Sequence, residues 1–259
     1  MTSWYDHPHY FDLIFRDETE MEVSFFEKAF EQFVPGAVKR ILEPGCGSGR
    51  LVVAMAQKGY DVTGLDLNQP MLDYMVSQLK AEGVSAAAVL GDMTAMDFDE
   101  KFDAAFCTFN TFRHLTSTDA ALKHLRNVAD QLRDGGIYIL GLHLIPMDAD
   151  PECTEKWKAS DEHVKLKAKL KVVDFNRKTR LERLRVAIKA RKPSGEIERV
   201  KSEFSLRIYT PKQMKKLLGK VEDVFEIASI HDMDYEIDET RKFNKNLTDA
   251  VFILKRRER

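Results

Sequence analysis

Three glycines at alternate positions, between a short apolar run and a helix-like stretch, constrain this chain more than any other feature. They lie in "ILEPGCGSGRL", residues 41–51. Glycine lets the backbone approach a ligand closely, and the start of a helix presents amide donors to that ligand. The stretch therefore predicts a strand, a ligand-binding turn and a helix, which is the beginning of an α/β fold.

The segments around this loop continue the same pattern. Short apolar runs alternate with longer amphipathic ones from residue 40 to 144, which predicts stacked βαβ units and a parallel sheet. An N-terminal stretch, 19–33, carries apolar residues near helical spacing and is expected to cover one edge of that sheet. The expected strands are 40–43, 61–65, 86–90, 102–108 and 137–144, and the expected helices between them are 49–58, 70–82 and 117–133.

The pattern changes after residue 144. Runs such as "VKLKAKLKVVDF" alternate apolar and charged residues with a period of two, which predicts antiparallel strands with one solvated face. We expect turns at 176–179 and 193–195, a capped helix from Thr210, and two last strands near 224–230 and 250–255. The predicted organisation is one domain in four parts: an N-terminal helical lid (1–36), a cofactor-binding core (37–145), a β-rich insertion (160–209), and a helix and strands that complete the sheet (210–259).

Composition excludes several classes of protein. The chain has 259 residues, of which 44% are hydrophobic and 32% charged, and its formal net charge is −2. These values are those of an ordinary globular protein and argue against a nucleic-acid coat or an acidic tail. No apolar run is long enough to span a bilayer and the N-terminus lacks the layout of a signal peptide, so a cytoplasmic location is expected. The three cysteines lack the spacing of a disulfide framework or a zinc site.

The glycine loop departs from the dinucleotide-binding fingerprint. That fingerprint, G-x-G-x-x-G, needs a glycine at the fifth residue after Gly45, where this chain has Arg50. Glu43 precedes the loop, and a carboxylate is poorly placed beside a pyrophosphate. An acid there suits a cofactor with a cationic end. S-adenosylmethionine is such a molecule, since it has a sulfonium and an ammonium but no phosphate.

Two further acids follow at the ends of the second and third expected strands. Asp66 can accept hydrogen bonds from both ribose hydroxyls, with Leu67 on the adenine face. Asp92 can accept from the adenine amino group while the backbone N–H of Met93 donates to a ring nitrogen. The carboxyl ends of strands are where open α/β sheets bind ligands. The alternatives are that Leu67 and Met93 are core residues and that Asp66 caps the next helix.

The motifs E-P-G-C-G-S-G, L-D-L-N, G-D-M and D-G-G, in this order over about residues 38–144, resemble those of the class I, Rossmann-like, S-adenosylmethionine-dependent methyltransferases. The resemblance implies an α/β fold: a seven-stranded sheet with a reversed last strand, helices on both faces, and an antiparallel β insertion after strand 5. Small-molecule members lay an aromatic N-terminal segment over the cofactor, and Tyr5 and Tyr10 are the matching candidates, with Tyr10 preferred. The cofactor-binding positions expected on this basis are Tyr10, Glu43, Gly45, Cys46, Gly47, Asp66, Leu67, Asp92, Met93 and Thr108.

The fourth expected strand ends in "CTFNTFRHL", residues 107–115, which in this fold lies beside the sulfonium. The stretch lacks the proline-containing motif with which amino-directed nucleic-acid methyltransferases hold a flipped base. It also lacks a Pro-Cys nucleophile and the acids of a magnesium site. We therefore expect metal-independent, in-line transfer of a methyl group to a nitrogen or oxygen of a small molecule. His143, His114 and Asn110 are the candidate catalytic residues, because a base must lie near a strand end and histidine titrates near neutrality.

The expected insertion leaves other interpretations open. It is rich in lysine and arginine, which is compatible with an RNA methyltransferase that uses a basic surface. Lysines and arginines on the solvated face of antiparallel strands explain the same pattern, and on that interpretation nucleic acid is not a partner. A third possibility is a protein that binds S-adenosylmethionine without catalysis. Exposed sheet edges favour pairing, so either a monomer or a homodimer is expected.

Overall fold

The computed structural model describes residues 3–146, 148–150 and 152–258. The strands are β1 (Arg40–Pro44), β2 (Asp61–Asp66), β3 (Ala87–Leu90), β4 (Phe102–Cys107), β5 (Leu132–His143), β6 (Thr154–Ser160), β7 (Lys165–Asn176), β8 (Leu181–Arg191), β9 (Ile197–Arg207), β10 (Phe225–His231) and β11 (Asp249–Arg256). The α-helices are α1 (Pro8–Phe15), α2 (Thr19–Phe33), α3 (Arg50–Gln57), α4 (Gln69–Glu82), α5 (Thr118–Gln131) and α6 (Pro211–Leu218). Short 3-10 helices are η1 (Trp4–Asp6), η2 (Arg16–Glu18), η3 (Thr111–His114) and η4 (Gly219–Val221).

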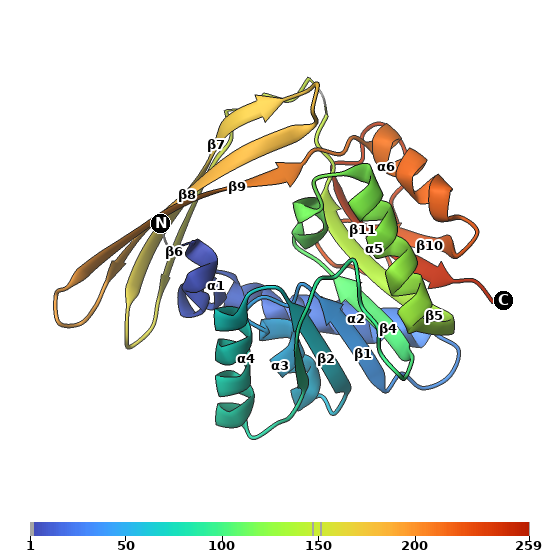
Figure 1. The fold of residues 1–259 in the computed structure, drawn as a ribbon, viewed down its shortest axis with the longest axis horizontal. Helices are drawn as coiled ribbons and strands as arrows, with labels where there is room; N and C mark the ends of the chain where they lie inside the picture. The colour runs from blue at the N-terminus through green and yellow to red at the C-terminus, as the bar shows by residue number, and fades with distance from the viewer. Residues whose placement is uncertain (1–2, 147, 151, 259) are drawn as a thin grey trace.

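These strands form two separate sheets (Figure 1). The larger sheet has seven strands in the order β10-β11-β5-β4-β1-β2-β3, and β11 is antiparallel to both of its neighbours. The smaller sheet has four antiparallel strands in the order β6-β7-β8-β9 and follows β5 in the chain. The predicted fold class, with its reversed last strand and its antiparallel insertion after strand 5, is confirmed.

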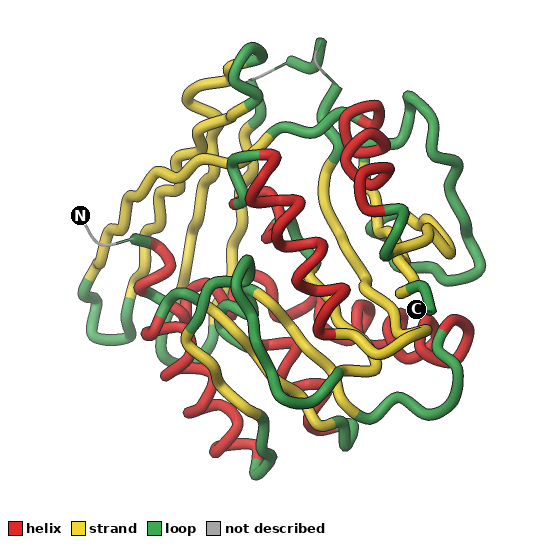
Figure 2. The backbone as a smooth tube through the Cα atoms, turned by 45° about the vertical axis from the view of Figure 1, so that its right-hand side comes forward, coloured by secondary structure: helices red, strands yellow, loops and turns green. Residues whose placement is uncertain are grey.

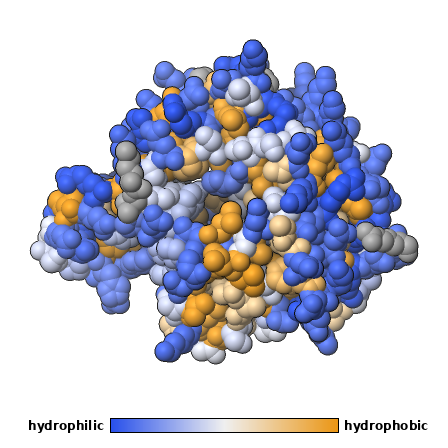
Figure 3. All heavy atoms as spheres, in the orientation of Figure 1, coloured by the Kyte–Doolittle hydropathy of each residue, from blue (hydrophilic) through white to orange (hydrophobic). Residues whose placement is uncertain are grey.

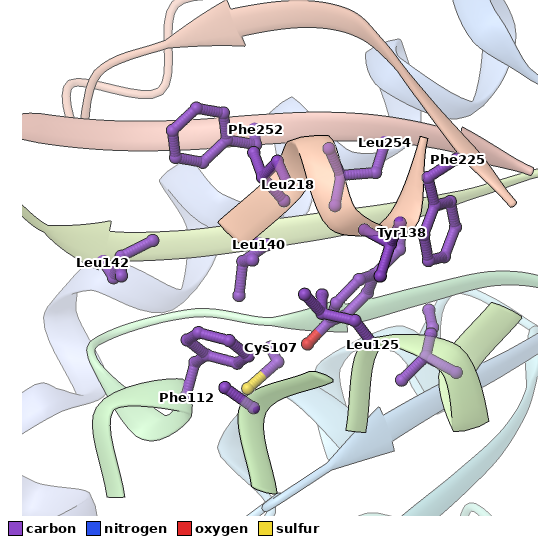
Figure 4. Packing of buried hydrophobic residues seen from close by; sticks show 14 of the residues in the cluster. Cys107, Phe112, Leu125, Tyr138, Leu140, Leu142, Leu218, Phe225, Phe252 and Leu254 are labelled. Atoms are coloured by element: carbon purple, nitrogen blue, oxygen red, sulfur yellow. The ribbon is translucent and has the colours of Figure 1, made fainter. Parts of the chain in front are cut away.

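Helices cover both faces of the larger sheet, as the backbone view of Figure 2 shows. One hydrophobic core joins α2, α3 and α4 to the sheet, and the other joins α5 and α6 to the opposite face. Neighbouring residues of β1 enter different cores, Ile41 the first and Leu42 the second, because successive side chains of a strand point to opposite faces. Figure 4 shows part of the second core, where Tyr138 and Leu140 of β5 lie close to Leu218 of α6.

One predicted boundary is wrong. The helix expected over 117–133 ends at Gln131, and the following strand begins at Leu132 instead of residue 137. The D-G-G sequence that predicted a turn lies within β5, where Gly135 has a φ of +75° and the pairing with β4 shifts register. A glycine in an irregular strand satisfies the same backbone requirement as a glycine in a turn, so the sequence signal was ambiguous.

The insertion has a different character on its two faces. Its inner face contributes Leu166, Val186 and Val200 to a third core, which also contains Trp4 and Phe15 from the N-terminal segment. On its outer face Lys158, Lys167, Lys189 and Arg199 stand directly opposite one another across all four strands. The turns lie where they were predicted. Strand β6 was missed, since the alternating pattern was recognised only from residue 163 onward.

Within the described residues no helix is both long and apolar enough to cross a membrane.

Candidate active site

A cavity of about 810 Å³ lies between the larger sheet and the insertion. The face seen in Figure 3 is hollowed there, with hydrophobic residues (orange) gathered beside the hollow. The ends of β1, β2, β4 and β5 reach this cavity, at the point where the chain passes from β3 back to β4, on the other side of β1. Such a switch point is where open α/β sheets bind ligands, and the volume suits a small-molecule site.

The glycine loop forms one wall of the cavity. Its three glycines have φ values of +76°, +54° and +76°, a region that favours glycine over other residues. A Cβ at Gly45 would lie 2.4 Å from Thr111 Cγ2, and one at Gly49 would lie 2.1 Å from Met75 Cγ, so these two positions are fixed by packing. At Gly47 the nearest atom would be 3.8 Å away, and this residue lines the cavity. Gly47 therefore leaves room for a ligand against the backbone.

Asp66, at the end of β2, faces the cavity beside this loop. Its Oδ2 accepts a hydrogen bond from the Gly47 N–H at 2.8 Å, and its Oδ1 accepts from the Asn68 N–H at 2.9 Å. Burial raises the pKa of the Asp66 carboxyl. Leu67 also lines the cavity, although its side chain is 71% exposed. The pair thus offers a carboxylate next to an uncovered apolar surface.

Asp92 and Met93, the two expected cofactor-binding residues that follow β3, differ in their exposure to the cavity. Met93 lines the cavity, and its carbonyl oxygen lies 2.8 Å from Nδ1 of buried His124, whose Nε2 lies 2.7 Å from the Tyr138 hydroxyl. Burial lowers the pKa of His124 to about 4, so its ring is neutral and holds the Met93 backbone without charge. Asp92 is exposed and lies outside the cavity lining, with its Oδ1 accepting from the Thr94 N–H at 2.7 Å.

Three of the expected cofactor-binding side chains lie behind the glycine loop, away from the cavity. Glu43 is buried near Arg50, and burial raises the pKa of its carboxyl well above the ordinary value. Thr108 is also buried and donates to Glu22 Oε1 at 2.8 Å, while Glu22 forms an ion pair with Arg50. Cys46 is buried with its sulfur 3.9 Å from the sulfur of Met75. These three buried residues can affect a ligand only through the position of the loop, whereas the residues that line the cavity can contact a ligand directly.

The N-terminal segment reaches the cavity through Tyr5 and not through Tyr10. Tyr5 lines the cavity and its hydroxyl lies 3.0 Å from His114 Nε2. Tyr10 lies outside the lining; its hydroxyl donates to Glu198 Oε2 at 2.6 Å and its ring stacks on His7. The geometry therefore favours Tyr5 over the residue that the sequence analysis preferred.

His143 lines the cavity at the end of β5, on the other side of β1 from Asp66, and it has a partner that the sequence analysis missed. Its Nδ1 forms a short hydrogen bond with Oδ1 of Asp249, and both residues line the cavity. Hydrogen bonding to His143 lowers the pKa of the Asp249 carboxyl. Antiparallel pairing places the first residue of β11 beside the last residue of β5, since Asp249 is in register with His143. An acid directly before the expected last strand, 250–255, was the signal that could have revealed this pair.

The other two catalytic candidates have different surroundings. His114 lines the cavity, and burial lowers its pKa to about 4, which makes it a weak base at neutral pH. Asn110 has a left-handed backbone, with φ +70°, and its Oδ1 accepts from the His143 N–H at 2.9 Å and from Arg113 Nη1 at 3.2 Å. Asn110 therefore holds His143 in place through the backbone of β5. Strained backbone of this kind is typical of functional sites.

The cavity also contains residues that the sequence did not mark as site residues. Glu18 of η2 faces it near Arg50, and burial raises the pKa of this carboxyl. The insertion contributes Trp157 and Phe175, and the loop after β4 contributes Phe109. Among the described residues, no group of three or more histidines, cysteines or acids is arranged to hold a metal ion.

Comparison with known proteins identifies the fold and the central part of the chain. Residues 41–136 match the family model described as a methyltransferase domain. The cypemycin N-terminal methyltransferase of Streptomyces sp. is 31% identical over 102 residues, which are 39% of this chain and 41% of that protein. The aligned segments span less than half the length of the first curated relatives that this chain matches.

Two solved structures are similar over nearly the whole chain. An S-adenosylmethionine-dependent methyltransferase of Clostridium acetobutylicum ATCC 824 has a TM-score of 0.77 at 19% identity and covers 96% of this chain and 97% of that one. The sugar N-methyltransferase KedS8 of Streptoalloteichus sp ATCC 53650 has a TM-score of 0.74 at 17% identity and covers 96% and 93%. At this identity the likeness shows the fold.

The sheet order, with the glycine loop at the switch point and the cavity beside it, is that of the class I, Rossmann-like methyltransferase fold. Residues 41–136, which match the family model, form a methyltransferase domain. The predicted family and its cofactor are confirmed.

Proposed function

We propose that this protein transfers a methyl group from S-adenosylmethionine to a nitrogen or oxygen of a small molecule, without a metal ion. The observation that carries the proposal is one continuous cavity with different chemistry at its two ends. Asp66 and Gly47 lie at one end, and the His143–Asp249 pair lies at the other. A carboxylate next to open backbone suits a nucleoside, and a histidine held by an acid suits proton removal.

The cofactor end has groups for each part of S-adenosylmethionine. Asp66 can accept from the ribose hydroxyls with the lone pairs that its two backbone donors leave free. Leu67 and Met93 offer apolar surface to the adenine, and the Glu18 carboxylate is available to the ammonium. The bound cofactor supplies an electrophilic methyl group on a sulfonium. The buried layer of Glu43, Thr108 and Cys46 would act through the shape of the loop.

At the acceptor end, His143 is the group that we expect to take a proton. Asp249 binds Nδ1, which leaves Nε2 as the nitrogen that can act as a base toward the acceptor. An acid orients a histidine in the same way in catalytic triads, where the histidine accepts a proton from a fixed direction. His114 is hydrogen-bonded to Tyr5 and is poorly basic, so it serves to shape the wall of the site.

Calorimetry and turnover test the proposal separately. Wild-type protein is titrated with S-adenosylhomocysteine and, in parallel, with a nicotinamide dinucleotide; we expect binding of the first and none of the second. A pool of small amines and hydroxyl compounds is then screened for release of S-adenosylhomocysteine from the donor. Preference for the dinucleotide would overturn the cofactor assignment. Binding without turnover of any pool member would favour a non-catalytic protein.

A further inference from the structure

Acidic side chains outnumber lysines and arginines among the residues that line the cavity. Arg113 is the single lysine or arginine among the lining residues in the described part of the chain. All three of its guanidinium nitrogens are engaged: Nε donates to the Arg207 carbonyl oxygen at 2.9 Å, Nη1 to Asn110, and Nη2 to Glu182 in a buried ion pair. Arg113 is therefore buried with its charge paired to Glu182, and it offers an anionic ligand little net positive charge.

Carboxylates, in contrast, remain available. Apart from Glu182, which Arg113 neutralises, and Asp66 and Glu18 at the cofactor end, the lining contains Asp150, Glu155 and Asp249. Asp150 and Glu155 are exposed and so lie toward the solvent side of the cavity. A phosphate or carboxylate on the acceptor would lose its hydration without gaining a cation, and it would be repelled by these acids. The same acids attract a cation.

Aromatic rings form a large part of the cavity lining, together with aliphatic side chains such as Leu144 and Leu184. The rings come from the N-terminal segment, the loop after β4 and the insertion: Trp4, Tyr5, Phe11, Phe15, Phe109, Trp157, Phe175 and Phe204. Trp4 and Phe204 lie parallel with centroids 6.2 Å apart, and Phe15 meets Phe109 edge-on at 4.8 Å. Ring faces bind apolar rings and also attract cations. Trp4 Nε1 is buried without a hydrogen-bond partner in the described structure and can donate to a bound molecule.

We propose that the acceptor is a primary or secondary amine on an apolar, ring-containing body, and that anionic acceptors such as phosphorylated or carboxylated compounds are excluded. This inference rests on the methyl transfer proposed for the same cavity. The amine reacts in its neutral form: its lone pair forms the new N–C bond, and the C–S bond breaks with its electrons remaining on sulfur. The proton of the resulting ammonium then passes to His143.

Tryptophan fluorescence can report binding of the acceptor, because both tryptophans of the chain, Trp4 and Trp157, line the cavity. With S-adenosylhomocysteine bound, intrinsic fluorescence is titrated against 2-phenylethylamine, its neutral analogue 2-phenylethanol and the anion 3-phenylpropionate. We expect the amine to bind at least tenfold more tightly than the anion, with the alcohol between them. Equal or tighter binding of the anion would overturn the inference.

A charge variant sharpens the test. Glu155→Gln removes one lining carboxylate, so the ratio of amine to anion affinity should fall by roughly threefold, since solvent-exposed charges interact weakly. Glu162→Gln is the matched control, because Glu162 is exposed and lies outside the lining. An unchanged ratio in Glu155→Gln would contradict the role of the acids.

The result separates the two proposals. If S-adenosylhomocysteine binds in the preceding calorimetry but the amine causes no change in fluorescence, the acceptor inference fails and the proposed methyl transfer stands. If S-adenosylhomocysteine itself does not bind, the proposed function fails.

Discussion

The two ends of the cavity are built in different ways. The cofactor end is formed largely by residues 45–93, one stretch of chain in which successive parallel strands end at the same edge of the sheet. The acceptor end is formed by the N-terminal segment, the loop after β4, the insertion and the start of β11. The cofactor end can therefore be predicted from the order of motifs in the sequence. The acceptor end forms only when segments that are distant in the sequence pack together.

The largest expected effect is a loss of turnover without a loss of cofactor affinity when His143 is replaced. His143→Ala should lower kcat by about 10²- to 10⁴-fold, the usual contribution of a positioned general base, and leave the affinity for S-adenosylhomocysteine unchanged. Turnover and calorimetry measure the two quantities. Asp249→Asn should give a smaller loss of kcat and an altered pH profile, because the imidazole loses its orienting acid. His163→Ala, at an exposed residue of the insertion, is the control. Weaker cofactor binding in His143→Ala would show that the ends are not independent.

The second effect concerns the ion pair between Arg113 and Glu182, which joins the loop after β4 to the insertion within the acceptor end. Arg113→Met leaves Glu182 buried and unpaired, which should reduce the free energy of unfolding by about 3–5 kcal/mol. Denaturant unfolding measures this loss. The double variant Arg113→Met/Glu182→Leu should recover most of it, because the buried charge is gone. A double variant as unstable as the single one would mean that the Arg113 bonds to the backbone, and not the charge, hold the insertion against the sheet.

The third effect belongs to the cofactor end alone. Asp66→Ala removes the carboxylate beside Gly47 and should weaken S-adenosylhomocysteine binding by roughly tenfold to a hundredfold, as for loss of hydrogen bonds to a charged group. Calorimetry gives the affinity. Asp73→Ala on the exposed face of α4 serves as the comparison. Undiminished affinity in Asp66→Ala would remove this residue from the site.

The smallest effect contrasts the outer face of the insertion with its packed inner face. Lys167 has Lys158 on one side and Lys189 on the other, and like charges directly opposite destabilise a sheet. Lys167→Glu should therefore raise the free energy of unfolding by about 0.2–1 kcal/mol, with the gain shrinking at high salt. Thermal unfolding at two salt concentrations measures it. Lys178→Glu, in the turn after β7, should show no such gain; an equal gain there would point to overall charge instead of the cross-strand row.

Much of the fold and of the cofactor end follows from the sequence, for reasons visible in particular residues. Apolar periodicity indicates strands that are buried on both faces, and the glycine loop marks the first strand end. The pattern cannot show which way a side chain points when both directions are buried, and so Glu43 and Thr108 were assigned to the ligand although they lie behind the loop. The partnership of His143 with Asp249 depends on the register of β11 with β5, which local sequence does not determine.

The contact between the N-terminal segment and strand β9 of the insertion has a consequence for the order of folding. Residues 40–143 pair mainly with neighbouring segments, whereas the Trp4 N–H reaches Ser202 Oγ and Tyr10 reaches Glu198 across most of the chain. Closing such long loops costs more entropy and slows their formation. We therefore expect the parallel strands to pair first on the ribosome, and the contacts of Trp4 and Tyr10 with the insertion to form last. The same contacts should open first in native-state hydrogen exchange, at a lower free energy than global unfolding, and would give a bulky acceptor a route into the cavity.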